Sequence, residues 1–128
     1  MRSEVKTWWE QAKADLDSAE ANLITKRHCA SVSFCQQAVE KALRAYVLNK
    51  AHNLQAPEMF GYSLIYLAKA CRLPEQFHSF LRDLTSEYVN TRYPTAAEEP
   101  PAALCDHTIA SRTLSSAKEV LEWIGKHL

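Results

Sequence analysis

The scarcity of helix-breaking residues constrains this chain more than any other feature. Its 128 residues include two glycines and five prolines, and three of the prolines stand at positions 94, 100 and 101. Glycine and proline destabilise a helix interior more than any other residue type, so long stretches of the chain contain nothing that interrupts a helix. This feature predicts an all-α fold.

Apolar residues recur at alternating spacings of four and three in the first 50 residues, which is the pattern of an amphipathic helix. The first series consists of Val5, Trp9, Ala12, Leu16, Ala19 and Leu23. A second series begins in a shifted phase and consists of Val32, Cys35, Val39, Ala42 and Tyr46. The shift predicts two antiparallel helices, joined by a tight turn near Thr25 to His28, with the second helix ending near Asn49.

The rest of the chain is predicted to form three more helices separated by loops at 50–62 and 94–103. Ser63 is expected to cap the first of them, Pro74 to stand in the first turn of the second, and the last to begin near Asp106. Their expected inward residues are Leu64, Leu67, Ala68 and Cys71, then Phe77, Leu81, Leu84 and Tyr88, and finally Ala110, Leu114, Ala117, Leu121 and Ile124. An up-and-down bundle of four or five helices is the simplest arrangement of these elements.

Length and charge limit what such a bundle can do. A chain of 128 residues can bury one core, so residues 1–128 are expected to form a single domain. Fifteen basic residues balance fifteen acidic ones, which excludes a strongly basic surface for nucleic acid. No apolar run approaches the roughly 18–20 residues that cross a bilayer, and the N-terminus lacks a signal peptide's apolar stretch. We therefore expect a cytoplasmic protein without a membrane partner.

The four cysteines are predicted to be free, structural thiols. They stand at positions 29, 35, 71 and 105, with no Cys-x-x-Cys spacing. A disulfide framework is typical of secreted chains, and a zinc site requires closely spaced pairs of ligands. Neither a disulfide nor a metal site is therefore expected. Trp8, Trp9 and Trp123 have two interpretations, as ordinary core and boundary residues or as contacts of a dimer.

Three segments resemble a known family. They are WWEQAKADLDSAEANL (8–23), SVSFCQQAVEKALRAYVL (31–48) and LTSEYVNTRYPTA (84–96). Together with the order of the helices, they are similar to the signature segments of the HEPN family (higher eukaryotes and prokaryotes nucleotide-binding), over nearly the whole chain. The combination of the second segment with the Arg92-Tyr93-Pro94 triplet is the most specific part, and it indicates the RYP-containing branch.

The resemblance implies a helical homodimer that works beside a minimal nucleotidyltransferase in a two-component or toxin–antitoxin system, with no cofactor. Many relatives are metal-independent ribonucleases with an Arg-x(4–6)-His motif presented across the dimer. The RYP branch looks more like a nucleotide-binding or structural one.

A ribonuclease of this kind needs a guanidinium and an imidazole in one cleft, to stabilise the phosphate and to move a proton. Arg72 and His78 have the required spacing, but Pro74 lies between them and the pair falls at a helix joint, away from the position of the family's motif. They are a weak catalytic candidate, and the favoured interpretation is that they are surface residues flanking a turn. Arg92 has no histidine within six residues, which disfavours nuclease activity.

Two groups of residues are candidates for nucleotide binding. Arg92 could hold a phosphate while Tyr93 stacks on a base, or Arg92 could simply bond the last carbonyls of its helix. On the second helix, Gln37, Lys41 and Arg44 share one flank, which is either a solvated, salt-bridged face or a polar stripe that holds phosphates.

Three hypotheses follow for function. The favoured one is a dimeric module that binds nucleotide or RNA phosphate and pairs with a nucleotidyltransferase. The alternatives are a purely structural dimer and a metal-independent endoribonuclease.

Overall fold

A computed structural model of the chain describes residues 2–50, 68–69, 72–84 and 105–128. These residues form three long helices, α1 (Ser3–Ile24), α2 (His28–Lys50) and α7 (His107–His127). A short 3₁₀ turn, η1 (Glu75–Phe77), continues into a helix over residues 78–84. The described ranges contain no strand, so the all-α prediction is confirmed.

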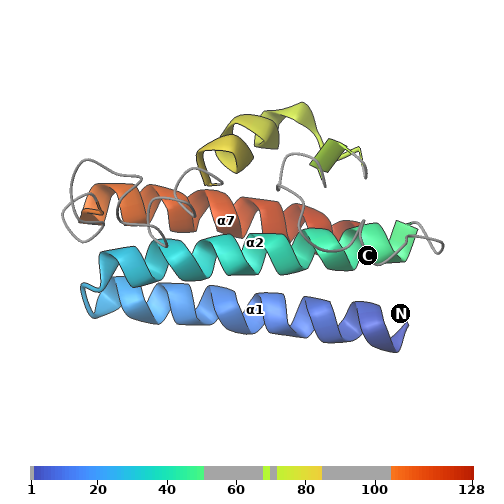
Figure 1. The fold of residues 1–128 in the computed structure, drawn as a ribbon, viewed down its shortest axis with the longest axis horizontal. Coiled ribbons are helices and arrows are strands. Elements are labelled where there is room, and N and C mark those ends of the chain that lie inside the picture. The colour runs from blue at the N-terminus through green and yellow to red at the C-terminus, as the bar shows by residue number, and fades with distance from the viewer. Residues whose placement is uncertain (1, 51–67, 70–71, 85–104) are drawn as a thin grey trace, which may run out of the picture.

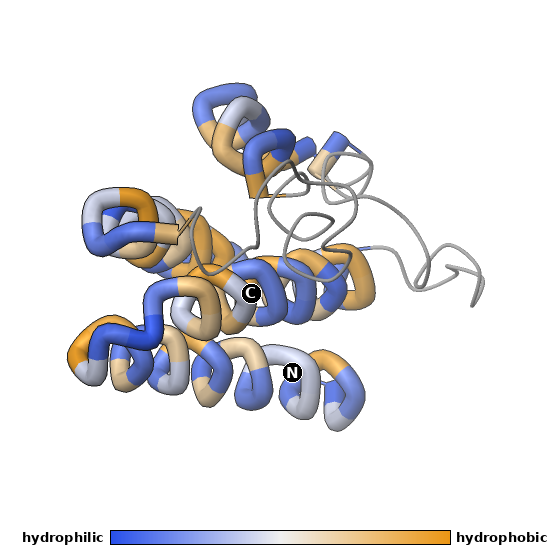
Figure 2. The backbone as a smooth tube through the Cα atoms, turned by 60° about the vertical axis from the view of Figure 1, so that its left-hand side comes forward, coloured by the Kyte–Doolittle hydropathy of each residue, from blue (hydrophilic) through white to orange (hydrophobic). Residues whose placement is uncertain are grey.

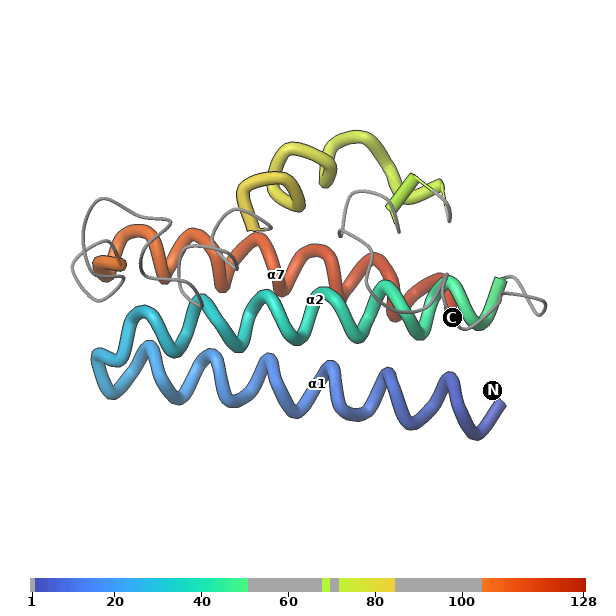
Figure 3. The backbone as a smooth tube through the Cα atoms, viewed as in Figure 1, coloured from blue at the N-terminus to red at the C-terminus, as the bar shows by residue number. Residues whose placement is uncertain are grey.

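The long helices lie side by side, with α2 between α1 and α7 (Figure 1). α1 and α2 are antiparallel, α7 runs parallel to α2, and the helix over 78–84 runs in the opposite direction on the side of α7 away from α1 (Figure 3). The described helices therefore alternate in direction, as the up-and-down prediction requires. The α1–α2 turn and the start of α7 lie at one end of the bundle, and both termini lie at the other.

The core follows the predicted apolar series. All five residues expected to face inward from the last helix are buried, as are Phe77, Leu81 and Leu84. Ala68 is also buried, whereas Leu64, Leu67, Cys71 and Tyr88 lie outside the described residues. Figure 2 shows hydrophobic residues concentrated between α2 and α7 and hydrophilic ones on the outer side of α1. Because α2 has a neighbour on both sides, it is buried along most of its length.

The α1–α2 turn is a Schellman motif. The backbone N–H of Lys26 donates to the carbonyl of Leu23 (3.1 Å), and that of Arg27 donates to Asn22 (2.8 Å). Lys26 has a φ of 63°, the left-handed conformation that this motif needs at the residue after the cap. The turn therefore closes as predicted, although it contains no glycine.

The three tryptophans pack within the chain. Trp123 makes edge contacts with Tyr46 and Phe77, at ring-centroid distances of 5.5 and 6.3 Å. Trp9 packs against Gly125, where an added Cβ would lie 3.0 Å from the indole ring. All three tryptophans are half-buried, and within the described part of the chain Ile24 is the one large hydrophobic side chain that is exposed. These contacts agree with the core-and-boundary interpretation, and the dimer-contact interpretation stays a prediction.

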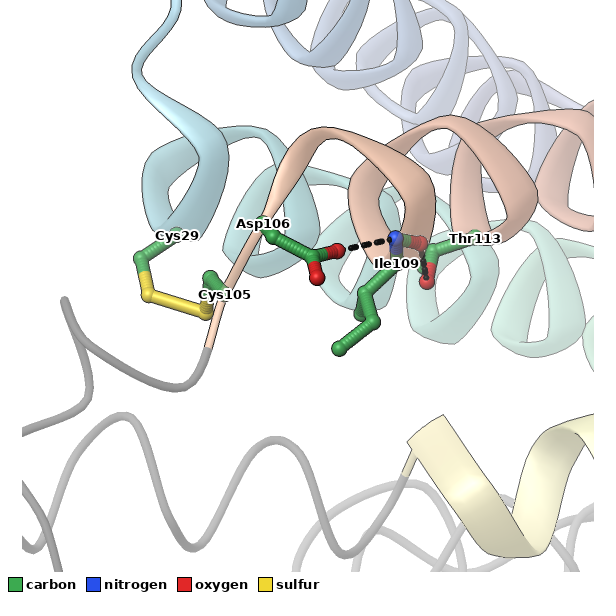
Figure 4. Close-up of a disulfide and its surroundings, with 5 residues drawn as sticks. All are labelled: Cys29, Cys105, Asp106, Ile109 and Thr113. Carbon is green, nitrogen blue, oxygen red and sulfur yellow. Dashed lines mark hydrogen bonds between the residues drawn. A yellow bond between two sulfur atoms is a disulfide. The ribbon is translucent and has the colours of Figure 1, made fainter.

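The prediction of four free thiols is wrong, because Cys29 and Cys105 form a disulfide (Figure 4). Their Cα atoms lie 5.2 Å apart although the residues are 76 positions apart in the sequence. Cys29 is in the first turn of α2, and Cys105 precedes Asp106, the N-cap of α7, so the bond exists because the two helices start at the same end of the bundle. Cys35 is free and buried, and position 71 lies outside the described ranges.

None of the helices described is long and apolar enough to cross a membrane. Within the same residues, no cluster of three or more His, Cys, Asp or Glu side chains could hold a metal ion.

Candidate functional site

Arg72 is not among the described residues that line a hollow with His78. Arg72 is exposed and has a φ of 58°, at the left-handed position of a second Schellman turn. In that turn its N–H donates to the carbonyl of Lys69 (3.2 Å), and the N–H of Leu73 donates to that of Ala68 (2.8 Å). Arg72 therefore has a structural position at a helix end, which agrees with the favoured interpretation of a surface turn residue.

His78 lies at the start of the helix over 78–84, with its ring held in place. Its Nε2 atom is 3.0 Å from the carbonyl oxygen of Leu73. A carbonyl only accepts, so Nε2 donates and carries the proton in the neutral ring. This bond leaves Nδ1 as the nitrogen that can accept a proton or a hydrogen bond.

His78 lines a hollow of about 560 Å³ together with Lys69, Glu75 and Arg82. We call these four residues the basic hollow. Glu75, His78 and Arg82 are spaced by three and four positions, which places them on one side of η1 and the helix that follows. Lys69 lines the hollow from the other side of the Schellman turn at Arg72.

The basic hollow contains two cations that no other described group neutralises. Lys69 and Arg82 are exposed, and neither side chain takes part in an ion pair or hydrogen bond among the residues described. Glu75 contributes one negative charge to the same hollow. A lysine ammonium and an arginine fork close to an imidazole are the groups that proteins use to hold phosphate.

The cations predicted on α2 are neutralised within the bundle. Lys41 donates to Asp15 at 2.5 Å, and the buried Asp15 carboxylate also accepts from Gln11 at 2.9 Å. The Arg44 guanidinium binds Glu40 at 2.9 Å, and it is itself buried.

Two further contacts hold the Glu40 end of this flank in place. The guanidinium carbon of Arg44 lies 5.8 Å from the ring centroid of Trp8, and Gln36 donates to the second oxygen of Glu40 at 3.2 Å. Gln37 is half-buried beside these groups. The solvated-face interpretation is thus right about the salt bridges but not about their exposure.

Arg92 and Tyr93 lie outside the described residues, so their approach to Lys41, Arg44 and Gln37 stays a prediction. Within the described part of the chain, the group that sequence reasoning missed is Lys69, Glu75 and Arg82. The spacing of four between His78 and Arg82 was the one available signal, because it places both side chains on the same face of a helix.

A second hollow, of about 520 Å³, lies on the other side of the helix over 78–84, against α7. Its charged residues are Asp83 and Arg112, and the others that line it are Ser79, Phe80, Leu84, Ile109, Thr113 and Ser116. Since the two charges among its described lining residues are of opposite sign, together they give this hollow no net attraction for phosphate.

The sequence and the arrangement of helices are both similar to those of known proteins. The family model of the HEPN domain matches residues 5–128 of the sequence. The chain belongs to the HEPN family. Two solved structures have the same fold over almost their full lengths. Among curated proteins, none matches this HEPN chain.

The first solved structure is TT1696 from Thermus thermophilus, with a TM-score of 0.86 and 25% sequence identity, over 99% of this chain and 100% of that one. The second is ST0689, described as an archaeal HEPN homologue, with a TM-score of 0.81 and 21% identity over 98% of each chain. The expected family and fold are therefore confirmed, whereas membership of the RYP branch stays a prediction.

Proposed function

We propose that this HEPN domain binds the phosphate groups of RNA or of a nucleotide in the basic hollow. The observation that carries the proposal is the contrast between two sets of cations. Lys41 and Arg44 are neutralised by carboxylates inside the bundle, whereas Lys69 and Arg82 face a hollow with no partner among the described residues. An anion from outside the chain is the ligand that this arrangement suits best.

The charge of the hollow limits the strength of binding. Lys69 and Arg82 together exceed Glu75 by one positive charge when His78 is neutral, and by two when it is protonated. Exposed charges of this number give modest affinity that falls as the salt concentration rises. We therefore expect the domain to bind one or two phosphates without selecting a sequence.

The remaining parts of the proposal rest on the family resemblance. We propose that Arg92 and Tyr93 supply a further contact for the nucleotide. Lys41 and Arg44 could contribute to that contact only by leaving Asp15 and Glu40, so Gln37 is the α2 residue that we propose beside it. We also propose a cytoplasmic homodimer that pairs with a minimal nucleotidyltransferase as a two-component or toxin–antitoxin system. Co-purification with a nucleotidyltransferase encoded beside this chain tests the pairing.

Ribonuclease activity is a second candidate because the basic hollow contains both an imidazole and a guanidinium. His78 has Nδ1 available for proton transfer, and Arg82 can stabilise a phosphate as negative charge develops on it. For this candidate we propose Arg82 in the arginine role in place of Arg72, because Arg82 lines the hollow with His78 and Arg72 does not.

Binding of a labelled single-stranded RNA, measured by fluorescence anisotropy at low salt, tests the site. Arg82→Ala and Lys69→Ala are each expected to weaken binding by about five- to tenfold. Each should also lower the slope of the logarithm of the binding constant against the logarithm of the salt concentration by about one. Arg112→Ala is the matched control, since it removes the same charge from the neighbouring hollow on α7. Equal weakening by Arg82→Ala and Arg112→Ala would show that binding is not located at the basic hollow.

The same RNA, incubated with EDTA, tests the ribonuclease candidate. Cleavage that is lost in His78→Gln and Arg82→Ala but retained in Arg72→Ala would assign the chemistry to the basic hollow. Intact RNA after incubation with the wild type would discard the ribonuclease candidate and leave the binding proposal in place.

A further inference from the structure

The disulfide lies beside a second group of cations, separate from the basic hollow. A hollow of about 260 Å³ is lined by Lys26, Arg27, His28, Cys29, Ala30 and Cys105. We call it the disulfide hollow. Both cysteines line it, and Cys29 is the more exposed residue of the two, because Cys29 is half-buried whereas Cys105 is 7% exposed.

The surroundings of Cys29 favour a negatively charged sulfur. Cys29 is in the first turn of α2, where backbone N–H groups point outward and no acidic residue is present. Arg27 precedes the helix, and its backbone carbonyl accepts from the N–H of Ser31. Its side chain contains only donors, so it cannot accept from the other N–H groups of the first turn. The positive end of α2 therefore acts on Cys29 together with the charges of Lys26 and Arg27.

The surroundings of Cys105 favour a negatively charged sulfur less strongly. His107 lies two residues further on and makes an edge contact with His28 at a centroid distance of 5.8 Å. Among the described residues Asp106 is the neighbouring negative charge, but its carboxylate is directed at α7, where it accepts from the N–H of Ile109 at 2.8 Å (Figure 4). Cys105 can thus leave as a thiolate, although its environment stabilises that charge less than the environment of Cys29 does.

We propose that Cys29 and Cys105 form a reversible thiol–disulfide site, which exchanges with anionic low-molecular-weight thiols through Cys29. In the first step an external thiolate attacks Sγ of Cys29, the Cys29–Cys105 bond breaks, and its electron pair passes to Sγ of Cys105, which takes up a proton from water. In the second step another external thiolate attacks the external sulfur of the mixed disulfide and releases the Cys29 thiolate. The products are two protein thiols and one oxidised external dimer.

The preference for an anionic thiol follows from Lys26 and Arg27. Both side chains are exposed and line the disulfide hollow, and neither takes part in an ion pair among the described residues. Their charges raise the local concentration of an anionic reagent and lower that of a cationic one. Cys35 does not compete, because burial raises the pKa of its thiol to about 12.

Two thiols of opposite charge, 3-mercaptopropionate and cysteamine, test the proposal on the oxidised protein at low salt. Reduction is followed by alkylation and mass spectrometry, and each rate is divided by the thiolate concentration of the reagent. We expect 3-mercaptopropionate to react at least about fivefold faster than cysteamine, and added salt to reduce this ratio.

Two double variants distinguish the effect of the cations beside the disulfide from the effect of the protein's overall charge. Lys26→Asn with Arg27→Gln is expected to bring the ratio of the two rates close to one, and asparagine suits the left-handed backbone at position 26. Lys6→Gln with Lys126→Gln removes the same charge from exposed positions at the other end of the bundle and should keep the ratio. Equal rates for both thiols in the wild type, or a ratio that both double variants change alike, would overturn the proposal.

The position of attack has its own measurement. Mixed disulfide trapped during partial reduction by 3-mercaptopropionate is expected on Cys29, and peptide mapping locates it. The assignment would be contradicted if the mixed disulfide were found mainly on Cys105. It would also be contradicted if thiols reduced the bond only under conditions that unfold the chain, or if mild oxidants did not form the bond.

Discussion

Lys26 and Arg72 have the same backbone role, which their sequence context does not reveal. Each occupies the left-handed position of a Schellman turn, with φ values of 63° and 58°. The Arg-x₅-His spacing counts positions along the chain, but Arg72 belongs to the turn and does not line the hollow that His78 lines. Among the described residues, Arg82, one helical turn after His78, is the arginine that lines this hollow.

Cys35 is a second residue whose environment decides its chemistry. It is fully buried between the long helices, and desolvation raises the pKa of its thiol to about 12 against an ordinary value of 9.0, with the charge of Lys118 acting in the opposite direction. The folded state therefore keeps the proton at a pH at which the unfolded chain loses it.

This difference predicts a loss of stability at alkaline pH. Between pH 9 and 12 the unfolded state binds fewer protons at Cys35 than the folded state, so the free energy of unfolding falls as the pH rises. From pH 8 to pH 10, Cys35 is expected to lower the free energy of unfolding by about 1 kcal/mol. Urea unfolding of Cys29→Ser with Cys105→Ser, which avoids disulfide exchange, provides the reference.

Adding Cys35→Ala to that reference should remove this part of the pH dependence while leaving the contributions of lysine and tyrosine unchanged. The same alkaline loss with and without Cys35 would contradict the role assigned to its burial.

At the scale of elements, the polar side of α2 is joined to α1 by its charges. The ion pair between Lys41 and Asp15 links α2 to α1, and the hydroxyl of Ser31 donates to the carbonyl of Ala19 at 2.7 Å. Lys118 and Glu20 form a further pair between α7 and α1 at 3.0 Å, but both are about half exposed, so it contributes little. Lys41, a candidate ligand contact in the sequence, thus makes a contact between helices.

The disulfide joins the starts of α2 and α7 and is expected to stabilise the fold substantially. It closes a loop between residues 76 positions apart, for which the chain-entropy model gives about 4 kcal/mol. Urea unfolding of the oxidised wild type should therefore show a higher free energy of unfolding than Cys29→Ser with Cys105→Ser. Dithiothreitol should lower the wild type to the level of the variant and leave the variant unchanged. A difference below about 1 kcal/mol would show that the two helix starts are held together without the bond.

At the scale of the whole molecule, the basis for a dimer has changed. Trp8, Trp9 and Trp123 make contacts within the chain and are half-buried, so the proposed homodimer rests more on the HEPN family resemblance than on surplus tryptophan surface. With a net charge of zero and an isoelectric point of about 7.0, long-range repulsion between two copies is weak at neutral pH. Sedimentation equilibrium at micromolar concentration should give twice the mass of 14.5 kDa. The mass of one chain under these conditions would contradict the dimer.

The sequence alone was enough to predict the helices of the described regions. The series from Val5 to Leu23 and from Ala110 to Ile124 each repeat with the period of a helix, which is a local property of the chain. Asp106 illustrates the same point, because a capping side chain acts on backbone only three residues away. The HEPN family could be identified for a similar reason, since its signature lies in the order of such local segments.

Tertiary structure alone decided which side chains meet. Cys29 and Cys105 pair because α2 and α7 begin at one end of the bundle, and Lys41 is neutralised because α1 presents Asp15 to it. The same holds for Lys69, which lines one hollow with His78 and Arg82 although the Schellman turn at Arg72 lies between them. Periodicity specifies which face of a helix is buried, but the partner on that face depends on how the helices pack, because it comes from a distant part of the chain.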